Sequence, residues 1–349
     1  MADTFKQALE RGCKSIPSVW IPTEIFSFSN KGHLYRARFL LLIIVSCWPL
    51  ILNSFFKLTF TPLYLGYLNA NIWLVSFGLI DALMLFSAFT AWNYLIDNAS
   101  DIDEILTTSD NRANPIKWID RWLSSKRQMV LPLFGALASP IVLGFVHSSV
   151  SKHLPVGLVS YLAISWTGFV GGSVLYWLWV VPGLPRQLAL AGNLNLRWYD
   201  PSSTPALRTV ARSLGIASIF NLMGAVSIVI FGFVLPQLLT VPSLAFVVDT
   251  FFVVSIATAV RVAIYPIIWY YRIIVTKKDE VLVQIEREIP KLSDAMRSSE
   301  WLTSSVALTL HRDVAATPDF PFSTVSMVQY TAALCGAIAA LIFSLVQHG

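Results

Sequence analysis

Three charged side chains stand inside long apolar segments of this chain. Asp81 lies in "FGLIDALML", and Asp249 and Arg261 share "VVDTFFVVSIATAVRV". An ionised side chain at the centre of a bilayer costs about 3 kcal/mol or more, so such residues normally face other helices or water. Asp249 and Arg261 lie about 18 Å apart along a helix, which is too far for them to pair with each other. Each therefore needs a partner on another helix, or water.

The predicted direction of each apolar segment places further polar residues at the same depths. The outer half of the bundle is expected to gather Asp81, Asp249, His147 and Asn53, and the inner half Arg261, Asn221, Gln329, Tyr330 and Tyr265. This pattern favours a water-filled acidic outer cavity that leads to a basic or hydrogen-bonded inner constriction, as in a cation pathway. The alternative is that the two carboxylates are neutral or paired with polar neighbours and serve only helix packing.

Seven apolar segments are long enough to position these residues as membrane-spanning helices. The chain of 349 residues is 55% hydrophobic and 13% charged, whereas a soluble domain carries about 25% charged residues. A spanning helix needs about 20 apolar residues, which predicts spans at 39–56, 72–94, 129–150, 156–181, 213–236, 244–270 and 324–346. The fold class expected is an all-α polytopic membrane protein.

The basic residues predict the orientation of these spans, because lysine and arginine accumulate in cytoplasmic loops. All but three of the 25 basic residues precede the first span or lie in alternate loops; the exceptions are Lys57, Lys152 and Arg261. The N-terminus is therefore expected in the cytoplasm and the C-terminus outside. The predicted parts are a cytoplasmic segment 1–38, a bundle 39–275 with cytoplasmic loops 97–128 and 182–212, a cytoplasmic helical segment 276–322, and the last span in 323–349.

Two capping residues followed by proline predict helix starts in the cytoplasmic loops. Asn114 precedes Pro115, and Thr204 precedes Pro205 after a turn at Asp200. A polar cap with proline at the first helical position is the usual start of a helix.

The segment 114–129 predicts an amphipathic helix on anionic lipid at the cytoplasmic face. Ile116, Ile119, Trp122 and Leu123 are expected to share an apolar face. The candidate lipid-binding residues are Lys117, Trp118, Arg121, Trp122, Lys126 and Arg127. A helix packed on other cytoplasmic helices fits the pattern equally well.

A seam of apolar residues continues from the sixth predicted span into the cytoplasm. It consists of Leu282, Ile285, Ile289, Leu292 and Met296, which recur at spacings of three and four residues, and Pro290 must kink or divide it. The seam predicts either a helical hairpin within one chain or a contact between subunits.

Small residues at four-residue spacing predict close helix contacts. Gly168 and Gly172 form such a ridge in the fourth span, and Ala332, Gly336 and Ala340 form one in the last. These ridges let helices approach within a subunit or between subunits.

The sequence carries no soluble-type catalytic motif, and its three cysteines and five histidines show no metal-ligand spacing. We therefore expect no enzymatic activity. We also expect no cofactor, no metal site and no nucleic-acid partner. The leading hypothesis is an ion channel or pore, oligomeric with copies of itself, with cytoplasmic gating helices. The alternatives are a non-conducting sensor or scaffold that binds a cytoplasmic protein, and a proton-coupled secondary transporter.

Two stretches support a family resemblance. "ATPDFPFSTVSMVQYTAALCGAIAALIFSLV" and "DPSSTPALRTVARSLG" resemble segments of uncharacterised bacterial multi-pass proteins, in which a charged helix precedes a Trp/Phe-Pro-Phe segment and a last span. This resemblance implies a location in the bacterial cytoplasmic membrane and brings no activity. In layout alone, seven spans and a long cytoplasmic loop before the last one are similar to insect chemoreceptor channels, and no residue role is carried over.

Overall fold

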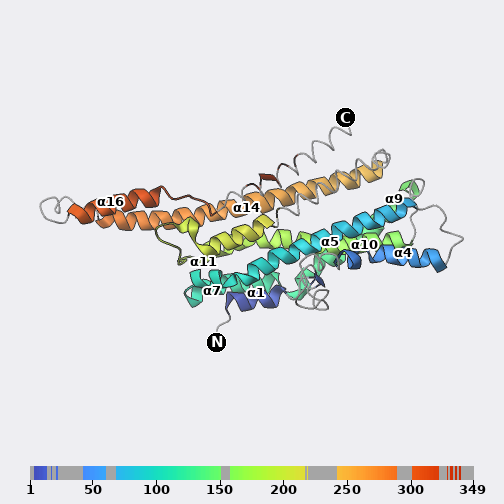
Figure 1. Cartoon of the computed structure of the whole chain (residues 1–349), viewed down its shortest axis with the longest axis horizontal. Coiled ribbons are helices and arrows are strands. Elements are labelled where there is room, and N and C mark those ends of the chain that lie inside the picture. The colour runs from blue at the N-terminus through green and yellow to red at the C-terminus, as the bar shows by residue number, and fades with distance from the viewer. Residues whose placement is uncertain are drawn as a thin grey trace.

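The protein is an elongated bundle of helices that lie roughly along one axis in the computed structural model (Figure 1). The structure describes residues 4–13, 17, 21–22, 42–59, 68–150, 158–216, 218, 242–288, 301–321, 328, 331–332, 335 and 338. Every secondary-structure element within these residues is a helix. The all-helical fold class is therefore confirmed.

Three stretches of the described chain are long and apolar enough to cross a membrane: Phe77–Asp97, Lys126–Gly144 and Leu158–Ala191. The first belongs to α5 (Leu68–Asp97), and the second begins in α8 (Ser125–Gln128) and continues in α9 (Val130–Val150). The third belongs to α10 (Leu158–Val180), continued by η2 (Val181–Gly183) and α11 (Leu184–Ala191). Membrane-type helices are thus confirmed at the second, third and fourth predicted spans. The total of seven spans, their orientation and a cytoplasmic layer stay predictions.

The first predicted span, 39–56, contains Pro49, which predicts a kink, and the structure interrupts its helix just before that residue. Residues 42–46 are helical, Cys47 forms a turn, and α4 (Trp48–Thr59) follows. Pro49 has no N–H to donate, and it lies in the first turn of α4, where that N–H would have no partner within the helix. The chain remains hydrogen-bonded through the turn, because the Cys47 N–H donates to the Ile43 carbonyl at 2.9 Å and the Leu50 N–H donates to the Cys47 carbonyl at 2.9 Å.

Helix α10 lies at the centre of the apolar bundle, where it packs on α9, α5, α4 and α14 (Pro242–Glu288). Its Ser165 hydroxyl donates to the Ala136 carbonyl of α9 at 2.6 Å. Near its other end, Trp177 meets Trp92 of α5 edge to face, with ring centroids 6.0 Å apart. These contacts join α5, α9 and α10 into one unit.

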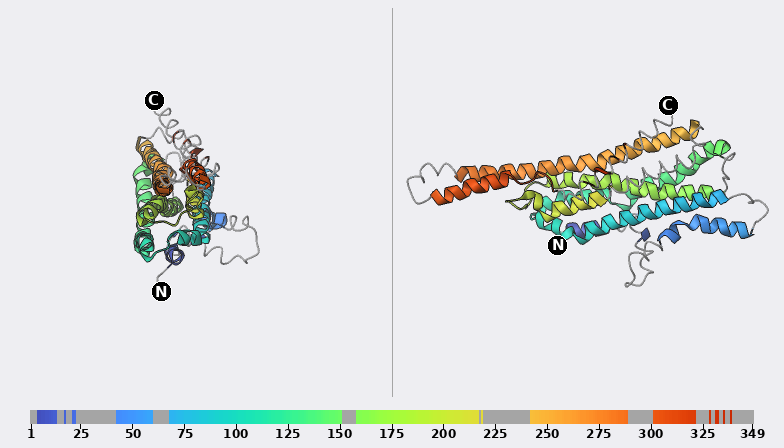
Figure 2. Two further views of the ribbon diagram at one scale, coloured as in Figure 1. Left: turned by 90° about the vertical axis from the view of Figure 1, so that its left-hand side faces the viewer. Right: turned by 45° about the horizontal axis from the view of Figure 1, so that its top comes forward.

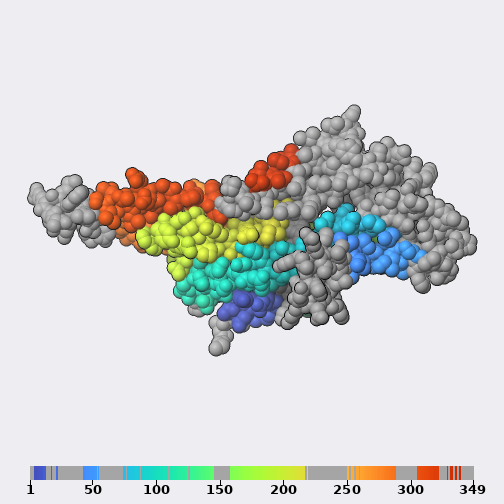
Figure 3. Space-filling model, in the orientation of Figure 1, coloured from blue at the N-terminus to red at the C-terminus, as the bar shows by residue number. Residues whose placement is uncertain are grey.

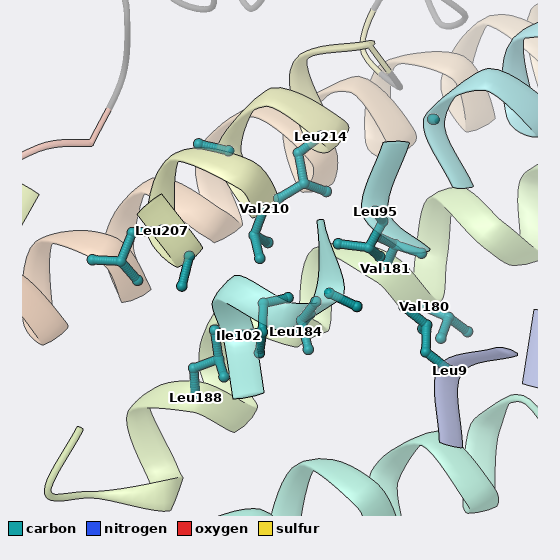
Figure 4. Packing of buried hydrophobic residues seen from close by; sticks show 14 of the residues in the cluster. Leu9, Leu95, Ile102, Val180, Val181, Leu184, Leu188, Leu207, Val210 and Leu214 are labelled. Carbon is teal, nitrogen blue, oxygen red and sulfur yellow. The ribbon is translucent and has the colours of Figure 1, made fainter. Parts of the chain in front are cut away.

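A layer of shorter helices caps one end of this unit. We call it the helical layer; it consists of α1 (Phe5–Cys13), α6 (Ala99–Ile105), α7 (Ser109–Trp122), α11 and the helix over 205–216. Figure 4 shows its aliphatic side chains meeting between these helices and the ends of α5 and α10, with Ile102, Leu188, Leu207, Val210 and Leu214 among them.

Helix α1 is an element that the sequence analysis did not predict. Its Phe5, Ala8 and Leu9 are buried in the layer, and the spacing of three and four residues between them is that of one helix face. The Asp103 carboxylate of α6 accepts hydrogen bonds from the backbone N–H groups of Phe5 at 2.8 Å and Lys6 at 3.2 Å. An acidic side chain from a distant part of the sequence therefore caps the N-terminus of α1.

Of the two predicted helix starts, one agrees with the structure and the other is wrong. A helix begins at Pro205 after Thr204, as expected. Helix α7 begins instead at Ser109, because the Thr108 hydroxyl accepts a hydrogen bond from the Asn111 N–H at 3.2 Å. Pro115 lies inside α7, which ends at Trp122, so the predicted continuous helix over 114–129 is wrong as well.

Helix α14 is unbroken over its 47 residues and is therefore about 70 Å long. This confirms the predicted continuation of the sixth apolar segment as one helix. Beyond the helical layer it is accompanied by α16 (Trp301–Ala315), and the two lie side by side in Figures 1 and 2. Figure 3 shows this pair projecting past the rest of the molecule. We call α14 from Tyr270 onward, together with α16, the hairpin.

Candidate functional site

Asp81 is the most deeply buried of the predicted site residues for which the structure describes a side chain. It lies in α5 with 1% of its surface exposed. Its Oδ2 accepts a hydrogen bond from the Thr167 hydroxyl of α10 at 2.9 Å. Its Oδ1 is buried and has no hydrogen-bond partner among the described residues. One carboxylate oxygen is thus available to a proton, a cation or a donor that helix movement would bring.

Close backbone packing surrounds Asp81. One turn before it, Gly78 lies so near the first span that a Cβ at this position would overlap the Cys47 sulfur. One turn after it, Leu85 is buried beside Leu42 and Val170. Asp81 is therefore held where the helix over 42–46, α5 and α10 meet.

The surroundings of Asp81 differ from the expected water-filled cavity. With 1% exposure, the side chain makes essentially no contact with solvent in this structure, and no salt bridge joins it to a described cation. A polar group buried with only half of its hydrogen-bonding capacity satisfied costs about 1 to 3 kcal/mol. Its position is accordingly a strained element of the packing, and a site where a proton or a cation would bind favourably.

Arg261 is half-buried on α14, where its side chain reaches α10. Its Nε and Nη2 donate to the Trp179 carbonyl of α10 at 3.1 and 3.0 Å. Its guanidinium lies 4.7 Å from the centroid of the Trp179 ring and 4.9 Å from that of Tyr265. Cation–π contacts and a backbone acceptor therefore satisfy this charge. Tyr265 is the one predicted inner-half partner that the structure places beside it.

The structure leaves the remaining members of the predicted polar groups unplaced. Asn53, His147 and Asp249 lie within α4, α9 and α14, and their side chains are outside the described residues. Asn221, Gln329, Tyr330 and Gly336 also lie outside the described residues. The gathering of Asp81 with Asp249, His147 and Asn53 stays a prediction.

The structure places Gly168 and Gly172 in the contact between α10 and α9 of the same chain. A Cβ at Gly168 would overlap the Gly135 carbonyl and the Ser139 hydroxyl, and one at Gly172 would overlap the Leu131 carbonyl. The neighbouring Gly171 has no atom within 4 Å of such a Cβ. The ridge thus allows two backbones to approach within one subunit.

The predicted lipid-binding residues separate into a packed group and an exposed group. Ile119 and Leu123 are buried in the helical layer, and Trp118 packs on Gly183. Trp118 is half-buried in this contact. The assignment of Trp122 to the apolar face shared with Ile119 and Leu123 is wrong. Trp122 faces outward, and the exposed residues are Lys117, Arg121, Trp122, Lys126 and Arg127.

The predicted seam lies in the hairpin for the part that the structure describes. Leu282 and Ile285 are half-buried on α14, which packs against α16 of the same chain. The Glu286 carboxylate contacts the His311 imidazole of α16, with Oε1 and Nε2 3.3 Å apart. Ile289, Leu292 and Met296 lie outside the described residues.

Lys278 is a site residue that the sequence analysis missed. It is 8% exposed, and its ammonium donates to the Ala315 carbonyl at 3.2 Å, the Thr317 carbonyl at 2.8 Å and Asp319 Oδ1 at 2.7 Å. The three donors of a lysine are thereby all used. Lys278 fastens the end of α16, and the chain that leads to the last apolar segment, onto α14.

Local sequence offered little warning of these contacts. Lys278 stands beside Lys277, and either could have been the buried residue. Thr167 lies among small residues that favour packing alone.

Comparisons with protein-family profiles, curated proteins and solved structures found no match for this chain.

Proposed function

We propose that this chain is a subunit of an oligomeric ion channel, with seven spans, its N-terminus in the cytoplasm and its hairpin acting on the gate. The observation that carries the proposal is the unbroken helix α14, which extends from the apolar segment with Asp249 to the hairpin at Glu288. The uneven distribution of the basic residues supports a cytoplasmic hairpin.

The hairpin is built so that its movement would reach the membrane by two routes. One is α14 itself, because a rotation or tilt of its hairpin part, from Tyr270 onward, would be transmitted along the same continuous helix to Asp249. The other is Lys278, which holds the segment from Thr317 to Asp319 directly before the last apolar stretch. A force applied at α16 would therefore shift two predicted spans together.

The dry contact at Asp81 fits a closed state in this proposal. The carboxylate meets Thr167 between α5 and α10, so permeating cations would reach it only after these helices separate. The unpartnered Oδ1 favours such a state, since an entering cation or water supplies the missing partner. Oligomerisation would place the permeation route on an axis shared by several copies of α14.

The test is conductance of the purified chain in planar bilayers, with a reversible lock on the hairpin. Glu286→His places a second imidazole against His311, whose partner lies 3.3 Å away, so that Ni²⁺ can bridge α14 and α16. We expect Ni²⁺ to change the open probability of the variant and EDTA to reverse it, with the wild type in Ni²⁺ as the control.

The permeation residues are tested in the same bilayers with Asp81→Asn plus Asp249→Asn. We expect reduced cation conductance or altered selectivity. Absence of current in wild type under voltage, pH and lipid conditions, or current unchanged by the double substitution, contradicts the channel proposal.

A second candidate is a non-conducting sensor or scaffold that binds a cytoplasmic protein. Two exposed apolar residues of α16 favour it: Val306 is 59% exposed and Leu308 51%. A hairpin that served only to move α14 would not need these side chains. If the wild type carries no current, Val306→Asp plus Leu308→Asp should abolish binding of the cytoplasmic partner protein. The variant should remain folded, as judged by thermal unfolding.

A further inference from the structure

Trp122 forms an exposed patch with two arginines at the junction of α7, α8 (Ser125–Gln128) and α9. The Arg121 guanidinium lies 5.7 Å from the Trp122 ring centroid, and the Arg127 guanidinium lies 5.5 Å from it. Trp122 is 39% exposed, and both arginines are exposed. We call these three residues the Trp122 patch. The two guanidinium groups both make cation–π contacts with the same indole ring.

The backbone that carries the Trp122 patch is tightly fixed. The Tyr176 hydroxyl of α10 donates to the Trp122 carbonyl. The buried Gln128 amide donates to the Gly12 carbonyl of α1 at 3.1 Å and to the Leu123 carbonyl. These hydrogen bonds fix the backbone on which the patch stands. None of them involves the side chain of Arg121, Trp122 or Arg127.

The Trp122 patch borders an apolar face. Directly after it, α9 exposes Val130, Leu133, Phe134 and Leu137, each between 49% and 67% exposed. These residues belong to one of the helices long and apolar enough to cross a membrane. A ligand bound at the patch would therefore have its charged end beside the arginines and its other end beside hydrocarbon-type side chains.

No carboxylate in the described part of the chain forms a salt bridge with Arg121 or Arg127. The nearest acidic residue in sequence, Asp120, is paired with Arg11 of α1 at 3.6 Å. Two unneutralised guanidiniums on a tryptophan attract an anion, and the planar fork of arginine binds phosphate oxygens in a bidentate manner. The tryptophan itself favours the polar–apolar boundary of a bilayer.

We propose that the Trp122 patch binds the headgroup of an anionic phospholipid, with the acyl chains along the exposed face of α9. The phosphate lies between Arg121 and Arg127, and Trp122 supports the glycerol region. This site places the bilayer surface at the junction of α7 and α9, and it requires only that the chain resides in a membrane. The site does not depend on conduction, so its failure and that of the channel proposal are separate results.

The experiment measures lipid affinity of the full-length protein. The chain is purified in a zwitterionic detergent and titrated with phosphatidylglycerol or phosphatidylcholine, and bound lipid is counted by native mass spectrometry. Each guanidinium near an anionic surface contributes about a fivefold gain in affinity. We expect Arg121→Gln plus Arg127→Gln to weaken phosphatidylglycerol binding about 25-fold, and to leave the weaker phosphatidylcholine binding unchanged.

The matched control removes the same charge elsewhere on the helical layer. Arg197→Gln plus Arg208→Gln replaces two exposed arginines outside the patch and should change the affinity less than twofold. Trp122→Leu keeps apolar bulk and should weaken binding severalfold. Size-exclusion profiles and thermal unfolding verify that every variant is folded.

Three outcomes overturn the proposal. One is equal loss of phosphatidylglycerol in the patch and control variants, which indicates attraction to net charge alone. Another is the absence of preference for phosphatidylglycerol over phosphatidylcholine in wild type. The last is competition by inorganic phosphate at the affinity of the lipid, which indicates an anion site in place of a lipid site.

Discussion

Removing the Lys278 ammonium should loosen the hairpin without disturbing the apolar bundle. Lys278→Met keeps the buried aliphatic stem and deletes three hydrogen bonds, to Ala315, Thr317 and Asp319. Hydrogen bonds to charged groups contribute about 1.5 to 3 kcal/mol each. The Asp319 side chain is 40% exposed, so water screens that pair and it contributes little. The two carbonyls then lose their donor, and together we expect a loss of about 3 to 6 kcal/mol.

Hydrogen exchange of the α16 amides measures this loss directly. Because tenfold in an opening equilibrium corresponds to about 1.4 kcal/mol, exchange in α16 should become at least about 100-fold faster. The matched control is Lys277→Met, since Lys277 pairs with Glu280 at 3.0 Å on the exposed face and such a pair contributes about 0.5 kcal/mol or less. Equal acceleration by the two substitutions, or none by Lys278→Met, would refute the assignment of Lys278 as the fastener of the hairpin.

Three further predictions concern contacts between helices. Thr167→Val removes the donor to Asp81 and should cost about 1 to 3 kcal/mol, whereas in an Asp81→Ala background, which lacks the acceptor, the cost should shrink. Thermal unfolding of the four forms in detergent gives the coupling, and a coupling of zero contradicts the contact. Gly168→Ala should destabilise the protein by about 1 to 3 kcal/mol because the new Cβ overlaps α9, while Gly171→Ala, which meets no atom within 4 Å, should be neutral or stabilising; the same melting experiment fails the interpretation if both behave alike. Asp103→Ala should release α1 at a cost of about 1 kcal/mol, seen as faster proteolysis within residues 5–13, and Glu104→Ala, exposed on the same helix, should not.

Sequence reasoning succeeded where the determining information was local. The apolar runs at α5, α9 and α10 predicted these helices because length and hydropathy are properties of the segment itself. The extension of α14 past the sixth apolar segment followed from the apolar spacing after it, although Pro266 lies inside the helix and gave a local signal for a break. The start at Pro205 was correct, while the start at Asn114 was wrong because Thr108, six residues earlier, caps a helix that begins at Ser109.

The contacts that define the site depend on residues far apart in the chain. Thr167 reaches Asp81, and Asp103 caps α1 across 98 residues. Composition and periodicity carry no information on which helix faces which, so the partner of Asp81 could not be identified. The apolar face of α1 at Phe5, Ala8 and Leu9 was the one readable signal that was overlooked.

The arginine–aromatic contacts indicate where α14 leaves the apolar region. Arg261 lies on Trp179 and Tyr265, and one turn further Trp269 lies 5.6 Å from Arg186 and 4.8 Å from Arg272. Such pairs suit the boundary between lipid and water, where a ring stays apolar while a guanidinium reaches the polar side. In the channel proposal these rings mark the membrane surface, and the part of the helix from Tyr270 to Glu288, about 28 Å long, lies in the cytoplasm. A lever of this length converts a small displacement at α16 into a tilt of the segment that carries Asp249, which is why the hairpin, and not the charged residues alone, is the feature on which the gating proposal depends.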